Sequence, residues 1–157
     1  MLAFRTVTYC TENEETPSTL EFTETAQNVV LIGGPGTGKT HLATAIGVAG
    51  IAAKGKRVRF YSTVDLVNEL EKEKREGKAG RIALALSRLD LVILDELGYL
   101  PFSQAGGALL FHLLSKLYEH TSVAPMWAPR CLGSAAIRSS VWAAMSNNKP
   151  YSAALFW

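Results

Sequence analysis

A glycine-rich run between two apolar segments constrains this chain more than any other feature of its sequence. Residues 33–40 read Gly-Gly-Pro-Gly-Thr-Gly-Lys-Thr and fit the phosphate-loop pattern G-x-x-x-x-G-K-[ST] at every position. The segment before it, 27–32, ends in Val-Val-Leu-Ile, and the segment after it, 40–53, is uncharged and rich in Ala, Leu and Ile. This order predicts a buried strand, a phosphate-binding turn and a helix.

The residue types in this run suit phosphate binding. Glycines let backbone N–H groups turn inward around phosphate oxygens, and the start of the helix adds partial positive charge. We expect Lys39 to reach the β- and γ-phosphates and the Thr40 hydroxyl to bind Mg²⁺. The full set of predicted nucleotide contacts is Gly33, Gly34, Pro35, Gly36, Thr37, Gly38, Lys39, Thr40 and His41. A chance glycine-rich turn is the alternative, and the complete match disfavours it.

A second apolar run supplies the acidic residues that such a loop needs. Residues 91–94 read Leu-Val-Ile-Leu and lead directly into Asp95 and Glu96. Parallel sheets bind ligands at the carboxyl ends of their strands, so Asp95 is expected to bind Mg²⁺. Glu96 is expected to orient and deprotonate an attacking water. Glu96 and Lys39 are therefore the predicted catalytic residues, and Thr40 and Asp95 the predicted metal ligands; a strand that ends in solvated acids is the alternative.

The residues after the second run decide between the two common nucleotides. Residues 95–98 also fit the D-x-x-G pattern of GTP-binding switches. A guanine-specific site needs a later N-K-x-D motif, but residues 148–151 read Asn-Lys-Pro-Tyr and lack the Asp that would bind guanine. The predicted cofactors are therefore ATP and Mg²⁺.

Apolar runs alternate with amphipathic segments over most of the chain. The predicted strands are 27–32, 57–61 and 89–94; the predicted helices are 40–53, a helix from 62 or 63 into 71–78, 81–88 and 104–120; a turn is predicted at 98–101. The uncharged helix at 40–53 is expected to be buried on most sides. The alternation indicates an α/β protein with a three-layer P-loop NTPase fold, a parallel sheet with flanking helices.

The pattern changes after Val123. Residues 124–157 hold 3 basic residues, all 3 Trp and no acidic residue, whereas 1–123 hold 13 basic and all 14 acidic residues. Prolines at 125 and 129 stand where the next strand is due, and a central strand does not readily accept proline. We therefore predict a P-loop core over 26–123, after a weakly structured segment over 1–25 and before an atypical, out-of-frame tail over 124–157. The net charge of +2 sums over unlike parts and indicates no partner.

Two stretches carry a resemblance to a known family. Residues 28–43 and 95–101 resemble the ATPase core of the IstB-like transposition helper proteins, relatives of the DnaC helicase loader in the AAA+ superfamily. The resemblance covers about residues 20–123. It implies an AAA+ ATPase domain, assembly into homo-oligomers on DNA and cooperation with an insertion-sequence transposase. It also implies that Lys39 and Thr40 belong to the Walker A motif, and Asp95 and Glu96 to Walker B.

The charged run at 71–81 has two interpretations of similar weight once this resemblance is considered. It fits a solvated helix face with pairs of opposite charge. It also fits DNA binding, because such ATPases can contact DNA in this region. The predicted DNA contacts are Lys72, Lys74, Arg75, Lys78 and Arg81.

Three features of the family are not recognisable after residue 123: a polar sensor, an arginine finger and a helical lid. Only 32 residues precede Gly33, where the family has a long helical region. We therefore expect a helper truncated at its front and out of frame after 123, which binds ATP, hydrolyses it slowly and does not readily oligomerise. The alternatives are a small-molecule P-loop kinase, with Arg130 and Arg138 serving its lid, and a non-functional remnant.

The sequence shows no targeting or membrane segment. The longest uncharged stretch, 97–115, contains Pro101, Gln104 and His112, which makes it a poor bilayer span. Cys10 and Cys131 form no disulfide framework. We expect a cytoplasmic protein with no membrane partner.

Overall fold

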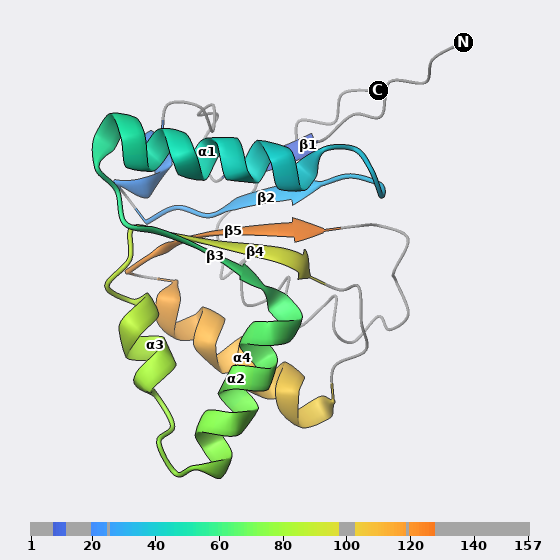
Figure 1. Ribbon diagram of the computed structural model, residues 1–157, viewed down its shortest axis with the longest axis vertical. Helices are drawn as coiled ribbons and strands as arrows, with labels where there is room; N and C mark the ends of the chain where they lie inside the picture. Colours follow the sequence, from blue (N-terminus) through green and yellow to red (C-terminus); the bar gives the residue numbers. More distant parts are fainter. Residues whose placement is uncertain (1–7, 12–19, 25, 98–102, 119, 128–157) are drawn as a thin grey trace.

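The computed structural model describes residues 8–11, 20–24, 26–97, 103–118 and 120–127, which contain a five-stranded sheet. Its order is β1-β2-β5-β4-β3 (Figure 1). The strands are β1 (Thr8–Thr11), β2 (Val29–Ile32), β3 (Val58–Ser62), β4 (Leu91–Leu97) and β5 (Ser122–Trp127). Strands β2 to β5 pair in parallel, while β1 pairs antiparallel with β2. The predicted parallel α/β sheet is confirmed.

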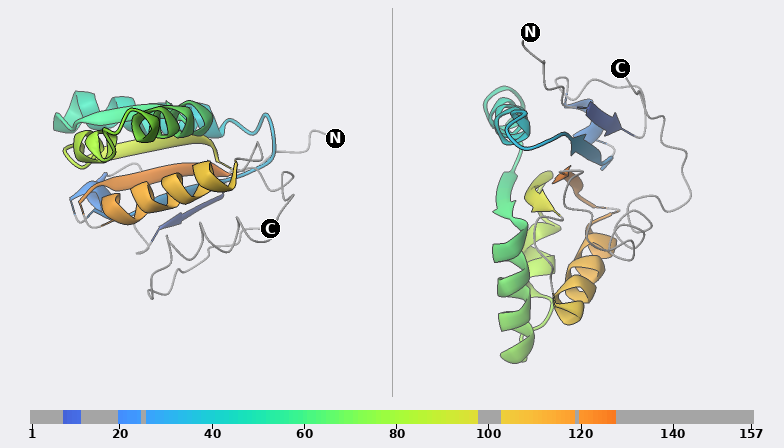
Figure 2. Two further views of the ribbon diagram at one scale, coloured as in Figure 1. Left: turned by 90° about the horizontal axis from the view of Figure 1, so that it is seen from below. Right: turned by 90° about the vertical axis from the view of Figure 1, so that its right-hand side faces the viewer.

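Helices cover both faces of this sheet. They are η1 (Glu21–Thr23), α1 (Lys39–Lys54), α2 (Thr63–Arg75), α3 (Arg81–Leu86) and α4 (Gln104–Leu117), so the four predicted α-helices are present. Figure 1 and Figure 2 show α1 on one face and α2, α3 and α4 on the other. Each helix in the described residues is too short or too polar to span a bilayer. The turn predicted at 98–101 lies outside the described residues.

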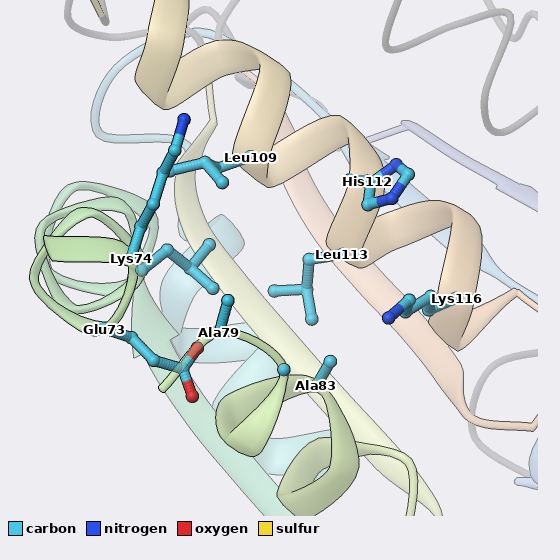
Figure 3. Close-up of a pocket in the computed structure, with 10 residues that line it drawn as sticks. Glu73, Lys74, Ala79, Ala83, Leu109, His112, Leu113 and Lys116 are labelled. Carbon is cyan, nitrogen blue, oxygen red and sulfur yellow. The ribbon is translucent and has the colours of Figure 1, made fainter. Parts of the chain in front are cut away.

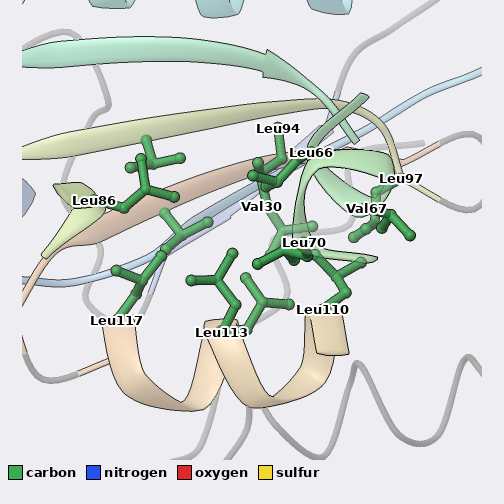
Figure 4. Close-up of a cluster of buried hydrophobic side chains, with 13 residues drawn as sticks. Val30, Leu66, Val67, Leu70, Leu86, Leu94, Leu97, Leu110, Leu113 and Leu117 are labelled. Atoms are coloured by element: carbon green, nitrogen blue, oxygen red, sulfur yellow. The ribbon is translucent and has the colours of Figure 1, made fainter. Parts of the chain in front are cut away.

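The two helical layers rest on separate cores. Side chains alternate along each strand, so in β4 Val92 and Leu94 belong to the core cluster shared with α2 and α4. Figure 4 shows Leu94 in this cluster. Leu91 and Ile93 pack toward α1 on the other face. All four are at most 2% exposed. Burial on both faces explains why the central strands read as continuous apolar runs rather than as an alternating pattern.

Strand β5 corrects the expectation that no strand follows Val123. It lies between β2 and β4, with Pro125 aligned with Leu94, and Ala124 and Met126 are 4% and 1% exposed. The register shifts between Leu94 and Leu97, so the ladder is already interrupted beside Pro125 and the missing N–H is tolerated. The expectation was wrong for residues 124–127; residues 128–157 lie outside the described part of the chain.

Residues 1–25 were expected to be weakly structured, and the described part of that segment is not. It contains β1 and η1, and Leu20 and Phe22 are 3% and 1% exposed in the core beneath α1. The Thr23 hydroxyl donates to the Leu20 carbonyl at 2.7 Å, which closes the turn. The polar composition hid this role because two apolar side chains are enough to anchor the segment.

Helix α1 also differs from its prediction. Its buried side consists of small or medium residues that include Ile46, Gly47 and Gly50, whereas Val48 and Ile51 are 58% and 53% exposed. A Cβ at Gly47 would lie 3.0 Å from Cδ1 of Ile93, so glycine lets α1 approach the sheet closely. The absence of charge therefore did not indicate burial on most sides.

Candidate functional site

The glycine-rich loop lies at the carboxyl end of β2 and leads directly into α1 (Figure 1). Gly36 and Gly38 have φ values of 69° and 89°, which L-residues with side chains adopt only with strain. No side chain caps the start of α1, and no acidic residue occupies its first turn. This end of the helix is therefore suited to an anion, because its first N–H groups have neither a capping oxygen nor a carboxylate.

Lys39 holds the loop from within. Its ammonium donates to the carbonyl oxygens of Gly33 at 2.7 Å and Gly34 at 2.8 Å. The Thr37 hydroxyl donates to the same Gly34 carbonyl at 2.8 Å. The Lys39 ammonium is thus held by backbone carbonyl oxygens of the loop, and phosphate oxygens could replace these two carbonyls as its acceptors.

Thr40 and Asp95 meet although 55 residues separate them in the sequence. The Thr40 hydroxyl donates to Oδ2 of Asp95 at 3.0 Å, which joins the first turn of α1 to the end of β4. A hydroxyl and a carboxylate are hard oxygen donors of the kind that Mg²⁺ prefers. The described residues contain no group of three or more His, Cys, Asp or Glu side chains that could hold a metal. A two-ligand oxygen site still fits Mg²⁺, which usually keeps waters and phosphate oxygens in its shell.

Glu96 follows with an exposed side chain and an unusual backbone. Its φ is 61°, a left-handed value that costs a non-glycine residue on the order of 1 kcal/mol. Its N–H donates to Oδ1 of Asp95 at 2.8 Å. The strained turn therefore lies at the residue predicted to orient water.

Sequence reasoning missed a residue that supports this turn. The Thr63 hydroxyl donates to the backbone carbonyl of Asp95 at 2.6 Å, and Thr63 is fully buried. The residue was considered only as a cap for α2. Its neighbour Ser62 is aligned with Asp95 in the β3–β4 register, so a polar residue after the adjacent strand was the available indication.

The remaining predicted site residues are consecutive with Lys39 and Thr40 in the sequence, in the loop and the first turn of α1. Gly33 is buried, Gly34 is half-buried, and Pro35, Gly36 and His41 are exposed. The structure thus places residues 33–41 in one loop and the first turn of α1, beside Asp95.

The structure places the predicted DNA contacts within one segment of the chain. They lie at the end of α2 and the start of α3, away from the glycine-rich loop (Figure 1). Lys74 lines a pocket between helices, and the Lys78 ammonium pairs with Glu76 at 3.0 Å. Lys72, Arg75 and Arg81 are exposed.

Comparison with known proteins gives a family for most of the chain. The family model for the IstB-like ATP binding protein matches residues 12–125. An insertion sequence IS21 ATP-binding protein of Pseudomonas aeruginosa is 44% identical over 104 residues, 66% of this chain and 39% of that protein. An IS5376 ATP-binding protein of Geobacillus stearothermophilus is 36% identical over 105 residues, 67% of this chain and 41% of that protein. The chain thus spans about two fifths of the length of these relatives.

Solved structures share the fold. The crystal structure of the DnaC helicase loader covers 87% of this chain and 75% of its own, with a TM-score of 0.59 and 24% identity. The AMPPCP-bound DnaA of Aquifex aeolicus covers 70% of this chain and 36% of its own, with a TM-score of 0.55 and 26% identity. The architecture is therefore that of the AAA+ P-loop domains.

Proposed function

The chain belongs to the family of IstB-like ATP binding proteins, and from that premise we propose that it binds ATP with Mg²⁺ in support of insertion-sequence transposition. The contact between Thr40 and Asp95 carries the proposal, because a hydroxyl and a carboxylate from distant segments converge beside an anion-suited loop. The names of several curated relatives, which are insertion-sequence ATP-binding proteins, support the biological setting.

Each residue of the site has a proposed role. The phosphates would be held by the Lys39 ammonium and by the backbone N–H groups of residues 33–41, except Pro35, which has no N–H. Thr40 and Asp95 would hold Mg²⁺, which when bound neutralises phosphate charge. Glu96 would orient a water molecule and accept its proton. Its left-handed backbone sets the direction in which the side chain leaves the main chain.

We propose that turnover is slow compared with binding. Charge that develops on the γ-phosphoryl group needs cations beyond Lys39, and an arginine is worth orders of magnitude in rate. The described arginines do not supply one. Arg57 is bound to Asp90 at the amino end of β4, and Arg59 lies over the Tyr61 ring at 5.5 Å. The others, Arg75, Arg81 and Arg88, belong to α2, α3 and the segment before β4.

DNA and a transposase are the proposed macromolecular partners. Support comes from the basic excess at the α2–α3 connection, where Lys72, Arg75, Lys78 and Arg81 are all exposed. Exposed cations of this kind contact phosphates without reading sequence, so binding should weaken steeply with salt. Titration of a labelled oligonucleotide at several salt concentrations tests the proposal, and a salt-independent affinity would contradict it.

The nucleotide proposal is tested with the wild type, Lys39→Ala and Glu96→Gln side by side. A fluorescent ATP analogue measures binding, and phosphate release measures turnover. We expect binding by the wild type and Glu96→Gln, loss of binding by Lys39→Ala, and turnover near background throughout. If Lys39→Ala binds the analogue as tightly as the wild type, the proposed site is wrong. Rapid phosphate release by the wild type would contradict only the proposal of slow turnover and would leave the proposed site standing.

A further inference from the structure

A pocket lies in the helical layer opposite α1. It has a volume of about 270 Å³ and is formed between the second half of α2, the start of α3 and the middle of α4 (Figure 3). Its apolar lining includes Leu70, Ala83 and Leu113, which come from these three helices in turn. The pocket is thus separate from the glycine-rich loop, which lies at the carboxyl end of the sheet.

The charged groups around this pocket are mostly basic. Lys74 from α2 and Lys116 and His112 from α4 line it, and all three are exposed. Glu73 is the one carboxylate among its lining residues, and it is only 9% exposed. Its Oε1 accepts the Ile82 N–H at 2.9 Å, and in Figure 3 its carboxylate lies beside α3.

Glu73 is therefore hydrogen-bonded to the start of α3, and it forms no ion pair with Lys74 or Lys116. The rim offers two ammonium groups to solvent above an apolar floor. Such a surface is complementary to a ligand that combines an apolar group with negative charge.

The size of the pocket narrows the class of ligand. Sites for small organic ligands usually begin at about 300 Å³, so this pocket is small for a cofactor. It is large enough for a single apolar side chain that anchors a protein segment. Nucleic acid phosphates would use the lysines but would leave the apolar floor uncovered.

We propose that this pocket is a docking site for an acidic segment of a partner protein. One leucine- or phenylalanine-sized side chain enters the apolar cavity, and neighbouring carboxylates pair with Lys74 and Lys116. The docking needs no nucleotide, because no residue of the pocket belongs to the loop or to the Thr40–Asp95 pair.

The test uses the full chain and two labelled synthetic peptides of about 15 residues. Both carry the same central leucine and phenylalanine; one has glutamates around them and the other has lysines. Fluorescence anisotropy at about 0.15 M salt, where the Debye length is about 8 Å, should show binding of the acidic peptide only. Lys74→Glu and Lys116→Glu should each weaken it by roughly tenfold. Ala79→Leu, at an exposed position that lines the pocket, should weaken it without a change in charge.

Arg88→Glu is the matched control. Arg88 is exposed, does not line the pocket, and its reversal changes the net charge by the same amount. It should leave peptide affinity within about twofold of the wild type, since salt screens an exposed charge that does not line the pocket. Thermal unfolding of each variant separates lost docking from lost folding.

Three results would overturn the proposal: no binding of the acidic peptide, equal binding of both peptides, or equal weakening by Arg88→Glu. A labelled single-stranded oligonucleotide is measured in the same way as the two peptides. If it binds with dependence on Lys74 and Lys116 while the acidic peptide does not, these lysines serve nucleic acid and the docking site is wrong. Nucleotide binding is measured in parallel, so failure here leaves the ATP proposal unaffected.

Discussion

The two ends of the parallel sheet are built for different purposes. At the carboxyl end, Lys39, Thr40 and Asp95 form polar contacts at partly exposed positions, beside left-handed backbone at Glu96. At the amino end, buried polar groups pair with the backbone and close the core, as when Asn28 Oδ1 accepts the Val123 N–H at 2.9 Å. The difference indicates that substitutions at the carboxyl end should change ligand binding, and substitutions at the amino end should change stability.

The largest expected effect is at the carboxyl end. Asp95→Asn removes the charged member of the proposed Mg²⁺ pair, so affinity for ATP in the presence of Mg²⁺ should fall by roughly hundredfold. Affinity measured with excess chelator should change little, because the loop and Lys39 remain. Isothermal titration with and without Mg²⁺ checks this. An equal loss under both conditions would mean that Asp95 supports the loop rather than a metal.

Gly106→Ala would test whether the carboxyl end also contains purely structural positions. A Cβ there would lie 2.7 Å from Cγ1 of Val67 and 2.9 Å from Oε1 of Glu71, which accepts the Ser103 hydroxyl. We expect a loss of about 2 kcal/mol in the free energy of unfolding from overpacking. Urea unfolding measures it. The matched control is Gly107→Ala, which has open space at its Cβ and should be neutral or stabilising.

At the amino end, Asn28→Ala should cost stability and leave ATP affinity unchanged. Asn28 is 3% exposed, and its removal leaves the Val123 N–H without its oxygen acceptor inside the sheet. The expected loss is about 1.5 kcal/mol in the free energy of unfolding. Chemical unfolding and ATP titration of one preparation would check both statements. A change in ATP affinity at constant stability would break the comparison between the two ends.

The same contrast explains which parts the sequence could predict. The loop at 33–40 was predictable because its chemistry depends on consecutive residues and on the helix directly after it. Strand β5 was not, because burial between β2 and β4 outweighs the local disadvantage of Pro125. Thr63 and the pocket at Lys74 and Lys116 were missed for a related reason: each depends on groups that only the folded chain brings together.

Thr63 allows a finer test at the carboxyl end. Thr63→Val keeps the shape but removes the hydroxyl that donates to the Asp95 carbonyl at 2.6 Å, which should cost about 1 kcal/mol of stability. Thr63→Ser keeps the hydroxyl and should retain the geometry at Glu96. If the hydrogen bond from Thr63 to the Asp95 carbonyl positions the turn at Glu96, Thr63→Val should lower the Mg²⁺-dependent part of ATP affinity more than Thr63→Ser does. Equal Mg²⁺ dependence in both variants would limit Thr63 to a structural role.

The smallest expected effect is a pH dependence at the amino end. Hydrogen bonds from the Arg57 guanidinium hold the pKa of Asp90 below its ordinary value of 3.8, and the Asp90 carboxylate also accepts the Arg57 N–H. A carboxyl group with a lowered pKa in the folded state stabilises the protein above its unfolded pKa. This stabilisation is lost as the pH falls through the folded value.

Asp90→Asn should therefore lower the unfolding midpoint by at most about 3 °C at pH 7, since both partners contact solvent. The difference from the wild type should shrink as the pH falls below the unfolded-state pKa of about 4 and through the lower folded-state pKa, where the folded wild-type carboxyl group also becomes protonated. Calorimetry at pH 7 and pH 3 checks the sign. A difference that grows on acidification would exclude the Arg57 contact as its cause. ATP affinity at pH 7 should be unchanged, because the pair lies at the end of β4 opposite to Asp95.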